Sequence, residues 1–168
     1  CINQPEDGIL NYTSRSPCGV AGIIVPWNLP LYLLTFKLGP ALAYGNTVVA
    51  KPSEFTSVTA WMLCSLIKEA GIPDGVVNMV FGYGPRAGEA LIRHPDISLI
   101  TFTGSDRAGL HIAEVAGAMA KKVSLEVSKD HRPIYHCYFQ DSKRGIYSYL
   151  TDELDTTDNA TGNHITGG

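Results

Sequence analysis

The stretch from Gly19 to Lys51, GVAGIIVPWNLPLYLLTFKLGPALAYGNTVVAK, decides the fold because two apolar runs flank a longer helical one. The flanking runs, Gly19–Val25 and Thr47–Lys51, are continuous rather than alternating, which is typical of strands buried on both faces. Between them, Leu31–Ala43 has the length of a helix and is followed by the stop signal Gly45-Asn46. This order predicts a right-handed βαβ unit and therefore a parallel sheet.

The same alternation continues to Val127. Further strands are predicted at Val76–Phe81, Leu99–Phe102 and Lys122–Val127, with helices at Ser57–Ala70, Gly84–His94 and Asp106–Ala120. Five strands separated by four crossover helices predict an α/β fold, a doubly wound five-stranded parallel sheet that is a Rossmann-like variant.

The chain divides into three predicted parts. Residues 18–127 form the α/β domain, residues 1–17 are an extended lead-in that could add an edge strand, and residues 128–168 are an irregular C-terminal tail with weak periodicity. The first residue is Cys1 rather than a methionine, so we interpret the sequence as a fragment.

Composition narrows the classes of function. The net charge of −3 gives no electrostatic case for nucleic acid, and no apolar run is long enough for a membrane span. The cysteines are widely spaced, which favours reduced thiols in a cytoplasmic protein. His131, His136 and Cys137 lie close together, but three ligands without a fourth do not indicate a metal site.

Ligands of open parallel sheets bind beyond the carboxyl ends of the strands, so the residues there are the candidate site. The strand ends supply, in chain order, Pro26, Trp27 and Asn28; Lys51, Ser53 and Glu54; Gly82, Tyr83 and Gly84; Thr103, Gly104 and Ser105; and Glu126.

Lys51, Glu54 and Ser105 fit the chemistry of a nucleotide. Lys51 and Glu54 could hold the ribose of adenosine, where a carboxylate would repel a 2′-phosphate and so favour NAD over NADP. The alternative is a surface ion pair between Lys51 and Glu54. Ser105 opens a helix and could face a phosphate, although a helix cap is the commoner role for serine in that position.

Asn28 and Glu126 fit the chemistry of a carbonyl group. The Asn28 amide could stabilise an oxyanion, while the alternative is an N-cap for the helix that follows. Glu126 ends an apolar strand, where a desolvated carboxylate could have a raised pKa and act as a general base. A solvated strand-end carboxylate is the alternative.

Together these stretches resemble the aldehyde dehydrogenase superfamily over residues 16–127. The resemblance rests on Pro26-Trp27-Asn28, Lys51-Pro52-Ser53-Glu54, Gly82-Tyr83-Gly84-Pro85, Phe102-Thr103-Gly104-Ser105 and Ser124-Leu125-Glu126, all in family order. Residues 27–35 and 56–64 most resemble one branch of semialdehyde dehydrogenases within it.

The resemblance implies roles for these residues. Asn28 would be the oxyanion-hole amide and Glu126 the general base that activates water. The predicted NAD-binding residues are Ile24, Val25, Pro26, Trp27, Lys51, Ser53, Glu54, Gly84, Phe102, Thr103, Gly104 and Ser105. The substrate would be a small-molecule aldehyde, and full-length relatives would be homo-oligomers.

The sequence departs from the family after Glu126. Val127-Ser128-Lys129-Asp130 replaces the family's Leu-Gly-Gly-Lys, and no Gly-Gln-x-Cys nucleophile follows; Cys137 matches nothing. We therefore expect this chain to be inactive alone, with a tail unrelated to the family. A truncated pseudoenzyme that binds NAD or a partner is the alternative function. A third interpretation, an unrelated α/β dehydrogenase, is disfavoured because no Gly-x-Gly-x-x-Gly occurs.

The resemblance implies that helices and strands upstream and downstream of this sequence cover the family's sheet. Trp61, Met62, Leu66 and Ile67 are therefore expected to be partly uncovered, which predicts aggregation or chaperone dependence of the isolated chain.

Overall fold

The computed structural model describes the backbone of residues 2–6, 9–12, 14–129, 132–141 and 145–151, and the side chains of residues 12 and 14–127. The elements in chain order are β1 (Ile2–Glu6), β2 (Ile9–Tyr12), β3 (Val20–Ile24), α1 (Pro30–Ala43), β4 (Thr47–Lys51), η1 (Glu54–Thr56), α2 (Ser57–Glu69), β5 (Val77–Met79), η2 (Gly84–Gly88), α3 (Glu89–Arg93), β6 (Ile97–Ser105), α4 (Asp106–Ala118), β7 (Lys122–Lys129), β8 (Arg132–Asp141) and β9 (Gly145–Thr151).

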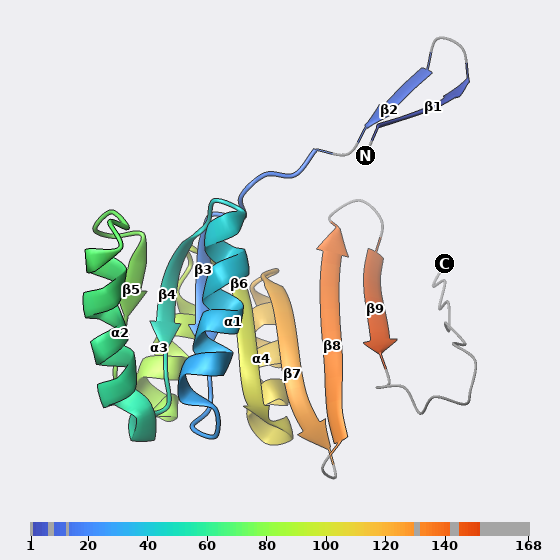
Figure 1. Ribbon diagram of the computed structural model, residues 1–168. Coiled ribbons are helices and arrows are strands. Elements are labelled where there is room, and N and C mark those ends of the chain that lie inside the picture. Colours follow the sequence, from blue (N-terminus) through green and yellow to red (C-terminus); the bar gives the residue numbers. More distant parts are fainter. Residues whose placement is uncertain (1, 7–8, 13, 130–131, 142–144, 152–168) are drawn as a thin grey trace.

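The main sheet has the strand order β5-β4-β3-β6-β7-β8-β9, and its first five strands are parallel (Figure 1). The predicted doubly wound parallel sheet is therefore confirmed. Two strands run further than predicted, because β6 extends to Ser105 and β7 extends to Lys129. Thr103, Gly104 and Ser105 consequently lie within a paired strand rather than just beyond it, and Glu126 lies within β7 as predicted.

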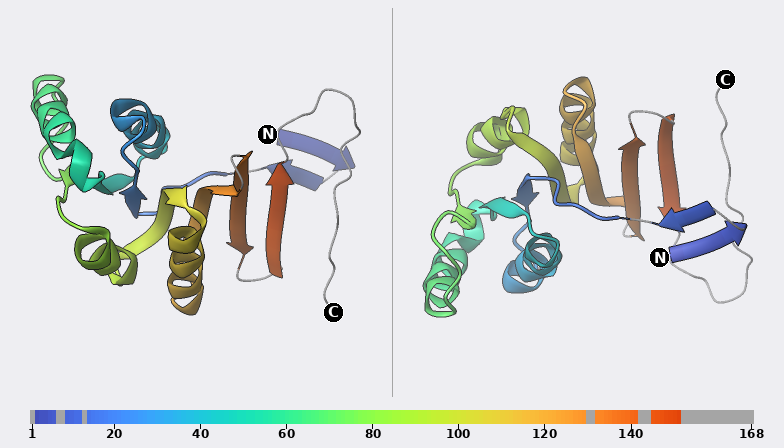
Figure 2. Two further views of the ribbon diagram at one scale, coloured as in Figure 1. Left: turned by 90° about the horizontal axis from the view of Figure 1, so that it is seen from below. Right: turned by 90° about the horizontal axis from the view of Figure 1, so that it is seen from above.

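Helices cover both faces of the parallel part of the sheet, with α1 and α2 on one face and α3 and α4 on the other (Figure 2). Residues of β3, β4 and β6 contribute to two separate cores, one on each face of the sheet. Ile23 packs with Leu34 under α1 and α2, whereas Ile100 packs with Ile92 and Ile112 under α3 and α4. Burial of each strand on both faces explains why the strand sequences are continuous apolar runs.

The predicted helix at Gly84–His94 is split in the structure. Gly84–Gly88 is a single π-helical turn, and the regular helix α3 covers only Glu89–Arg93. Pro85 stands in the first turn, where a missing N–H costs nothing. Single π-helical turns are frequent at functional sites.

Both ends of the chain differ from their sequence expectations. Within the lead-in, β1 and β2 form an antiparallel hairpin of their own, apart from the main sheet (Figure 1). Within the tail, β8 pairs antiparallel with β7, and β9 with β8, so these two described segments are strands rather than irregular chain. β7 would otherwise be an open edge, and residues 132–151 are rich in the aromatic and β-branched types that favour strands.

Candidate functional site

The topology itself marks the crevice in which a ligand would bind. β3 and β6 are neighbours in the sheet, yet the chain leaves β3 into α1 on one face and β6 into α4 on the opposite face (Figure 2). Such a reversal of winding opens a crevice at the carboxyl ends of the two strands. The candidate residues that follow β3 and those at the end of β6 therefore border one crevice.

Glu126 is held by two side chains near this crevice. Thr103, its register partner on β6, donates a hydrogen bond from Oγ1 to Glu126 Oε2 over 2.6 Å. The Nζ atom of Lys37, from α1, lies 3.3 Å from the same carboxylate oxygen. The Lys37 side chain is buried and that of Glu126 is only 18% exposed. The carboxylate is thus neither a lone desolvated acid nor a freely solvated strand end.

Lys37 is a residue that the sequence analysis missed. It stands in a predominantly apolar helix, between Phe36 and Leu38, where a buried cation needs a partner. A single cation in an otherwise apolar helix is the sequence feature that could have identified Lys37. Thr103, which is predicted to contact the cofactor, donates its hydroxyl proton to Glu126.

Lys51 and Glu54 lie together where β4 ends. The Nζ atom of Lys51 is 3.5 Å from Glu54 Oε2, with the lysine side chain buried and the glutamate side chain 35% exposed. Ser53 is buried, and its hydroxyl accepts a hydrogen bond from the backbone N–H of Phe55. The ion-pair alternative is therefore present, but its buried lysine and partly open carboxylate leave the Glu54 oxygens accessible to a ligand.

Three glycines near these residues differ in the space around them. Gly88 is buried at the end of the π-helical turn, and a Cβ atom there would lie 4.0 Å from Cδ of Lys51, an ordinary van der Waals distance. At Gly104, a Cβ atom would stand 2.4 Å from Cζ of Phe102, so only glycine fits beside that buried ring. Gly84, where the π-helical turn begins, is exposed and has open space around it.

Ser105 caps helix α4, since its Oγ accepts a hydrogen bond from the N–H of Ala108 over 3.4 Å. The cap interpretation is thus confirmed, and a cap still leaves first-turn N–H groups without partners inside the helix. Asp106 follows directly, and its buried Oδ1 atom has no hydrogen-bond partner within the described part of the chain. A carboxylate there opposes the attraction of the helix N-terminus for a phosphate.

The residues after β3 pass from core to surface. Ile24 and Val25 are buried, Pro26 is half-buried, and Trp27 and Asn28 are exposed. Leu29, not Asn28, occupies the N-cap position of α1, and no side chain caps that helix. The N-cap alternative for Asn28 is therefore wrong, and the residue is exposed in the loop that follows β3.

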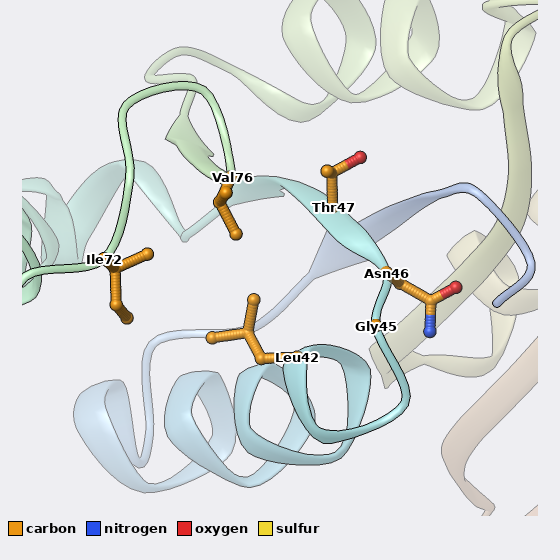
Figure 3. Close-up of a pocket in the computed structure, with 6 residues that line it drawn as sticks. All are labelled: Leu42, Gly45, Asn46, Thr47, Ile72 and Val76. Atoms are coloured by element: carbon orange, nitrogen blue, oxygen red, sulfur yellow. The ribbon is translucent and has the colours of Figure 1, made fainter.

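A hollow of about 280 Å³ lies at the opposite edge of the sheet (Figure 3). Its apolar part is formed by Leu42, Ile72 and Val76, whose side chains point toward one another. Asn46, also in its wall, is used structurally: its Oδ1 accepts from the N–H groups of Cys18 and Gly19. This hollow lies at the amino ends of β4 and β5, away from the candidate residues.

Among residues whose side chains the structure describes, no group of His, Cys, Asp and Glu could hold a metal ion. The side chains of His131, His136 and Cys137 lie outside the described residues. None of the described helices has the length and apolar character to cross a membrane.

Residues 1–132 match the model of the aldehyde dehydrogenase family. The chain belongs to this family. Its curated relatives include 2-aminomuconic semialdehyde dehydrogenase of Danio rerio, 63% identical over 127 residues, and that of Homo sapiens, 59% identical. Each alignment covers 76% of this chain and 26% of the relative, so the chain spans about a quarter of those proteins. The predicted likeness to a semialdehyde branch is thereby confirmed.

Solved structures agree with this family assignment. An aldehyde dehydrogenase from Bacillus cereus in complex with NAD+ superposes with a TM-score of 0.71 and 46% identity, covering 73% of this chain and 25% of that one. PnpE, solved in complex with nicotinamide adenine dinucleotide, gives a TM-score of 0.72 at 46% identity, covering 76% of this chain and 26% of its own.

Proposed function

We propose that this chain is the cofactor-binding part of an NAD-dependent aldehyde dehydrogenase, which oxidises an aldehyde to a carboxylic acid. The observation that carries the proposal is Glu126, held by Lys37 and Thr103 near the switch-point crevice. Family membership and the NAD complexes of two structural relatives support it. We place the cofactor domain at residues 18–127, between the lead-in and the tail.

The residues present fit a dinucleotide. Glu54 would accept hydrogen bonds from the ribose hydroxyls, and Lys51 would approach the same ring. Ser105 and the first turn of α4 would face the pyrophosphate. Ile24, Val25, Pro26, Trp27, Ser53, Gly84 and Phe102 would shape the walls. NAD, when bound, supplies the hydride acceptor for the oxidation.

The catalytic roles follow from the chemistry of the side chains. Asn28 would donate an amide N–H to the oxygen on which negative charge develops, and such donors are commonly worth about 3–4 kcal/mol. Glu126 would accept a proton from the water that releases the acid. Lys37 and Thr103 would fix the carboxylate oxygen that does not face the water. The identity to 2-aminomuconic semialdehyde dehydrogenases supports a semialdehyde as substrate.

The first test is NAD binding to the purified chain by isothermal titration. Glu54→Gln is expected to weaken NAD binding strongly, because an amide is a poorer acceptor for two ribose hydroxyls than a carboxylate. Glu69→Gln, at an exposed position on α2, is the matched control and should bind like the parent chain. Parent chain without measurable NAD binding, or equal affinity in Glu54→Gln, would contradict the proposal.

A second candidate function is a pseudoenzyme that binds NAD or a partner without chemistry. It is favoured by one observation: no cysteine follows Cys137, and no Gly-Gln-x-Cys occurs after Glu126. The intact mass of the native protein, captured with an antibody to residues 18–127, separates the two. A species much heavier than 18.1 kDa supports the dehydrogenase, whereas a native species at 18.1 kDa supports the pseudoenzyme.

We also propose a cytoplasmic location and homo-oligomeric full-length relatives. A relative named cytosolic aldehyde dehydrogenase 1 of Mus musculus, 57% identical over 125 residues, supports the location. Fractionation of source tissue with the same antibody tests it, and a signal confined to an organelle would contradict it.

A further inference from the structure

Cys18 is a thiol with an amine beside it at the amino ends of the strands. Its Sγ atom accepts a hydrogen bond from Nζ of Lys122, and the two atoms lie 3.5 Å apart. Cys18 stands just before β3 and Lys122 begins β7, so the contact joins two strands that β6 separates in the sheet (Figure 1). The two residues are 104 positions apart in the sequence.

The backbone of Cys18 is held on both sides. Its N–H donates to Oδ1 of Asn46 over 2.6 Å, and its carbonyl accepts a hydrogen bond from Oγ of Ser98 on β6. Lys122 is placed by the parallel pairing of β6 and β7, in which it is the register partner of Leu99. The sheet itself therefore brings the sulfur and the nitrogen together.

The pair is open to a small oxidant in solution. Cys18 is a free thiol in a half-buried residue, and Lys122 is exposed. A peroxide converts an accessible thiol into a sulfenic acid, which condenses with a neighbouring thiol or nitrogen. Groups held about 3–3.5 Å apart react far faster than the same groups free in solution. The amine of Lys122 stands at this separation from the sulfur, so it is the nucleophile placed to capture a sulfenic acid at Cys18.

We propose that Cys18 and Lys122 form an oxidation site, at which a peroxide leads to a covalent sulfur–nitrogen bond between the segment before β3 and strand β7. In the first step hydrogen peroxide transfers one oxygen atom to the Cys18 sulfur. The O–O bond breaks, an S–O bond forms and water leaves, so that sulfur is oxidised by two electrons and the peroxide is reduced.

The second step needs no further oxidant. The Lys122 ammonium releases a proton to solvent, and its nitrogen attacks the sulfur of the sulfenic acid. An S–N bond forms, the S–O bond breaks, and the hydroxide takes a second proton from the nitrogen and leaves as water. Relative to the thiol and the free amine, the protein has lost two hydrogen atoms. Two thiols of a reductant reverse the change and leave as a disulfide, which restores Cys18 and Lys122.

Such a bond should stabilise the fold. It closes a loop between residues 104 positions apart, and a cross-link over a long loop restricts the unfolded chain, as a disulfide does. We expect oxidation to raise the midpoint of thermal unfolding by about 5–15 °C. The pair lies at the amino ends of β3 and β7, at the opposite end of the sheet from the crevice, so the inference is independent of the proposed NAD function.

The test treats the full chain with hydrogen peroxide and maps its tryptic peptides by mass spectrometry. The expected product is a pair of peptides joined through Cys18 and Lys122, lighter than their sum by two hydrogen atoms and separated again by dithiothreitol. Lys122→Arg keeps the positive charge but replaces the amine by a poorly nucleophilic guanidinium, so it should abolish the joined pair. Cys64→Ser is the control: this thiol donates to the carbonyl of Ala60 within α2, and its loss should leave the joined pair in place.

Two results would overturn the proposal. One is a Cys18 that peroxide carries only to sulfinic or sulfonic acid, or into a disulfide, with no peptide joined to Lys122. The other is a joined pair that forms equally in the parent chain and in Lys122→Arg. The stabilisation is judged separately: a thermal midpoint that peroxide raises equally in the parent chain and in Lys122→Arg would show that the bond does not cause it.

Discussion

The Nζ atom of Lys37 lies 3.3 Å from Oε2 of Glu126, and this contact ties helix α1 to strand β7. Both side chains are largely withdrawn from water, and Thr103 donates to the same carboxylate oxygen. Each buried charge therefore depends on the other, because an unpaired ion in such a place is costly. The residue proposed as general base is thus positioned by two elements besides its own strand.

Replacement of Lys37 by methionine is expected to lower the free energy of unfolding by about 1–3 kcal/mol, because Glu126 would keep a single strong donor. The change is measured by urea denaturation at neutral pH. A double-mutant cycle with Glu126→Gln is the control. Lys37→Met should cost less stability in the Glu126→Gln background, because a neutral amide does not require a cationic partner. The cycle should therefore give a coupling energy between the two residues. Strictly additive effects would mean that the two charges do not stabilise each other.

Sequence patterns predicted the five parallel strands because continuous apolar runs and turn signals are local features. Contacts across the sheet were harder to predict. Lys37 was missed because its partner stands on a different element, and the hydrogen bond from Thr103 to Glu126 was missed because the two residues meet only through the register of β6 and β7. The pair of Lys51 and Glu54 could be predicted because the two residues are only three positions apart in the sequence. The split of the helix at Gly88 was missed, although a glycine lowers helix propensity at that position.

Asp106→Asn is expected to strengthen NAD binding several-fold. The Asp106 carboxylate stands in the first turn of α4 with its Oδ1 atom unpartnered, and it would repel the pyrophosphate proposed to lie beside Ser105. The same substitution should slightly lower stability, since a negative charge near a helix N-terminus is favourable. Isothermal titration at low and high salt tests this prediction. A gain in NAD affinity that is equally large at low and high salt would argue against an electrostatic cause.

Two glycines of α4 should respond in opposite ways to alanine. At Gly109 the added Cβ atom would stand 2.4 Å from Cγ1 of Val127, so Gly109→Ala should cost about 1–3 kcal/mol of stability. At Gly117 no atom lies within 4 Å of that position, and alanine should stabilise the helix by up to about 1 kcal/mol. Thermal unfolding of both variants measures the difference. Equal effects at the two positions would contradict the packing of α4 on β7.

Lys121 should make the free energy of unfolding depend on pH in the alkaline range. Burial lowers the pKa of its ammonium below 10.5, while Nζ donates to the carbonyl of His94. Between the lowered pKa and 10.5 the unfolded chain binds more protons, so the free energy of unfolding should rise with pH in that window. Denaturation series at rising alkaline pH should show this rise in the parent chain and lose it in Lys121→Met. A rise that survives the substitution would assign it to another group.

The outer face of α2 should make the isolated chain associate. Trp61, Met62 and Leu66 are 58–63% exposed, as the sequence predicted. Ile67 is partly buried and packs against the core under α1 and α2. Leu66→Lys removes apolar surface and adds a charge, so it should shift the chain toward monomer in sedimentation velocity experiments. Ser65→Lys adds the same charge at the neighbouring exposed position without removing apolar surface, and its effect should be smaller. A parent chain that is monomeric at all concentrations would show that this face does not drive association.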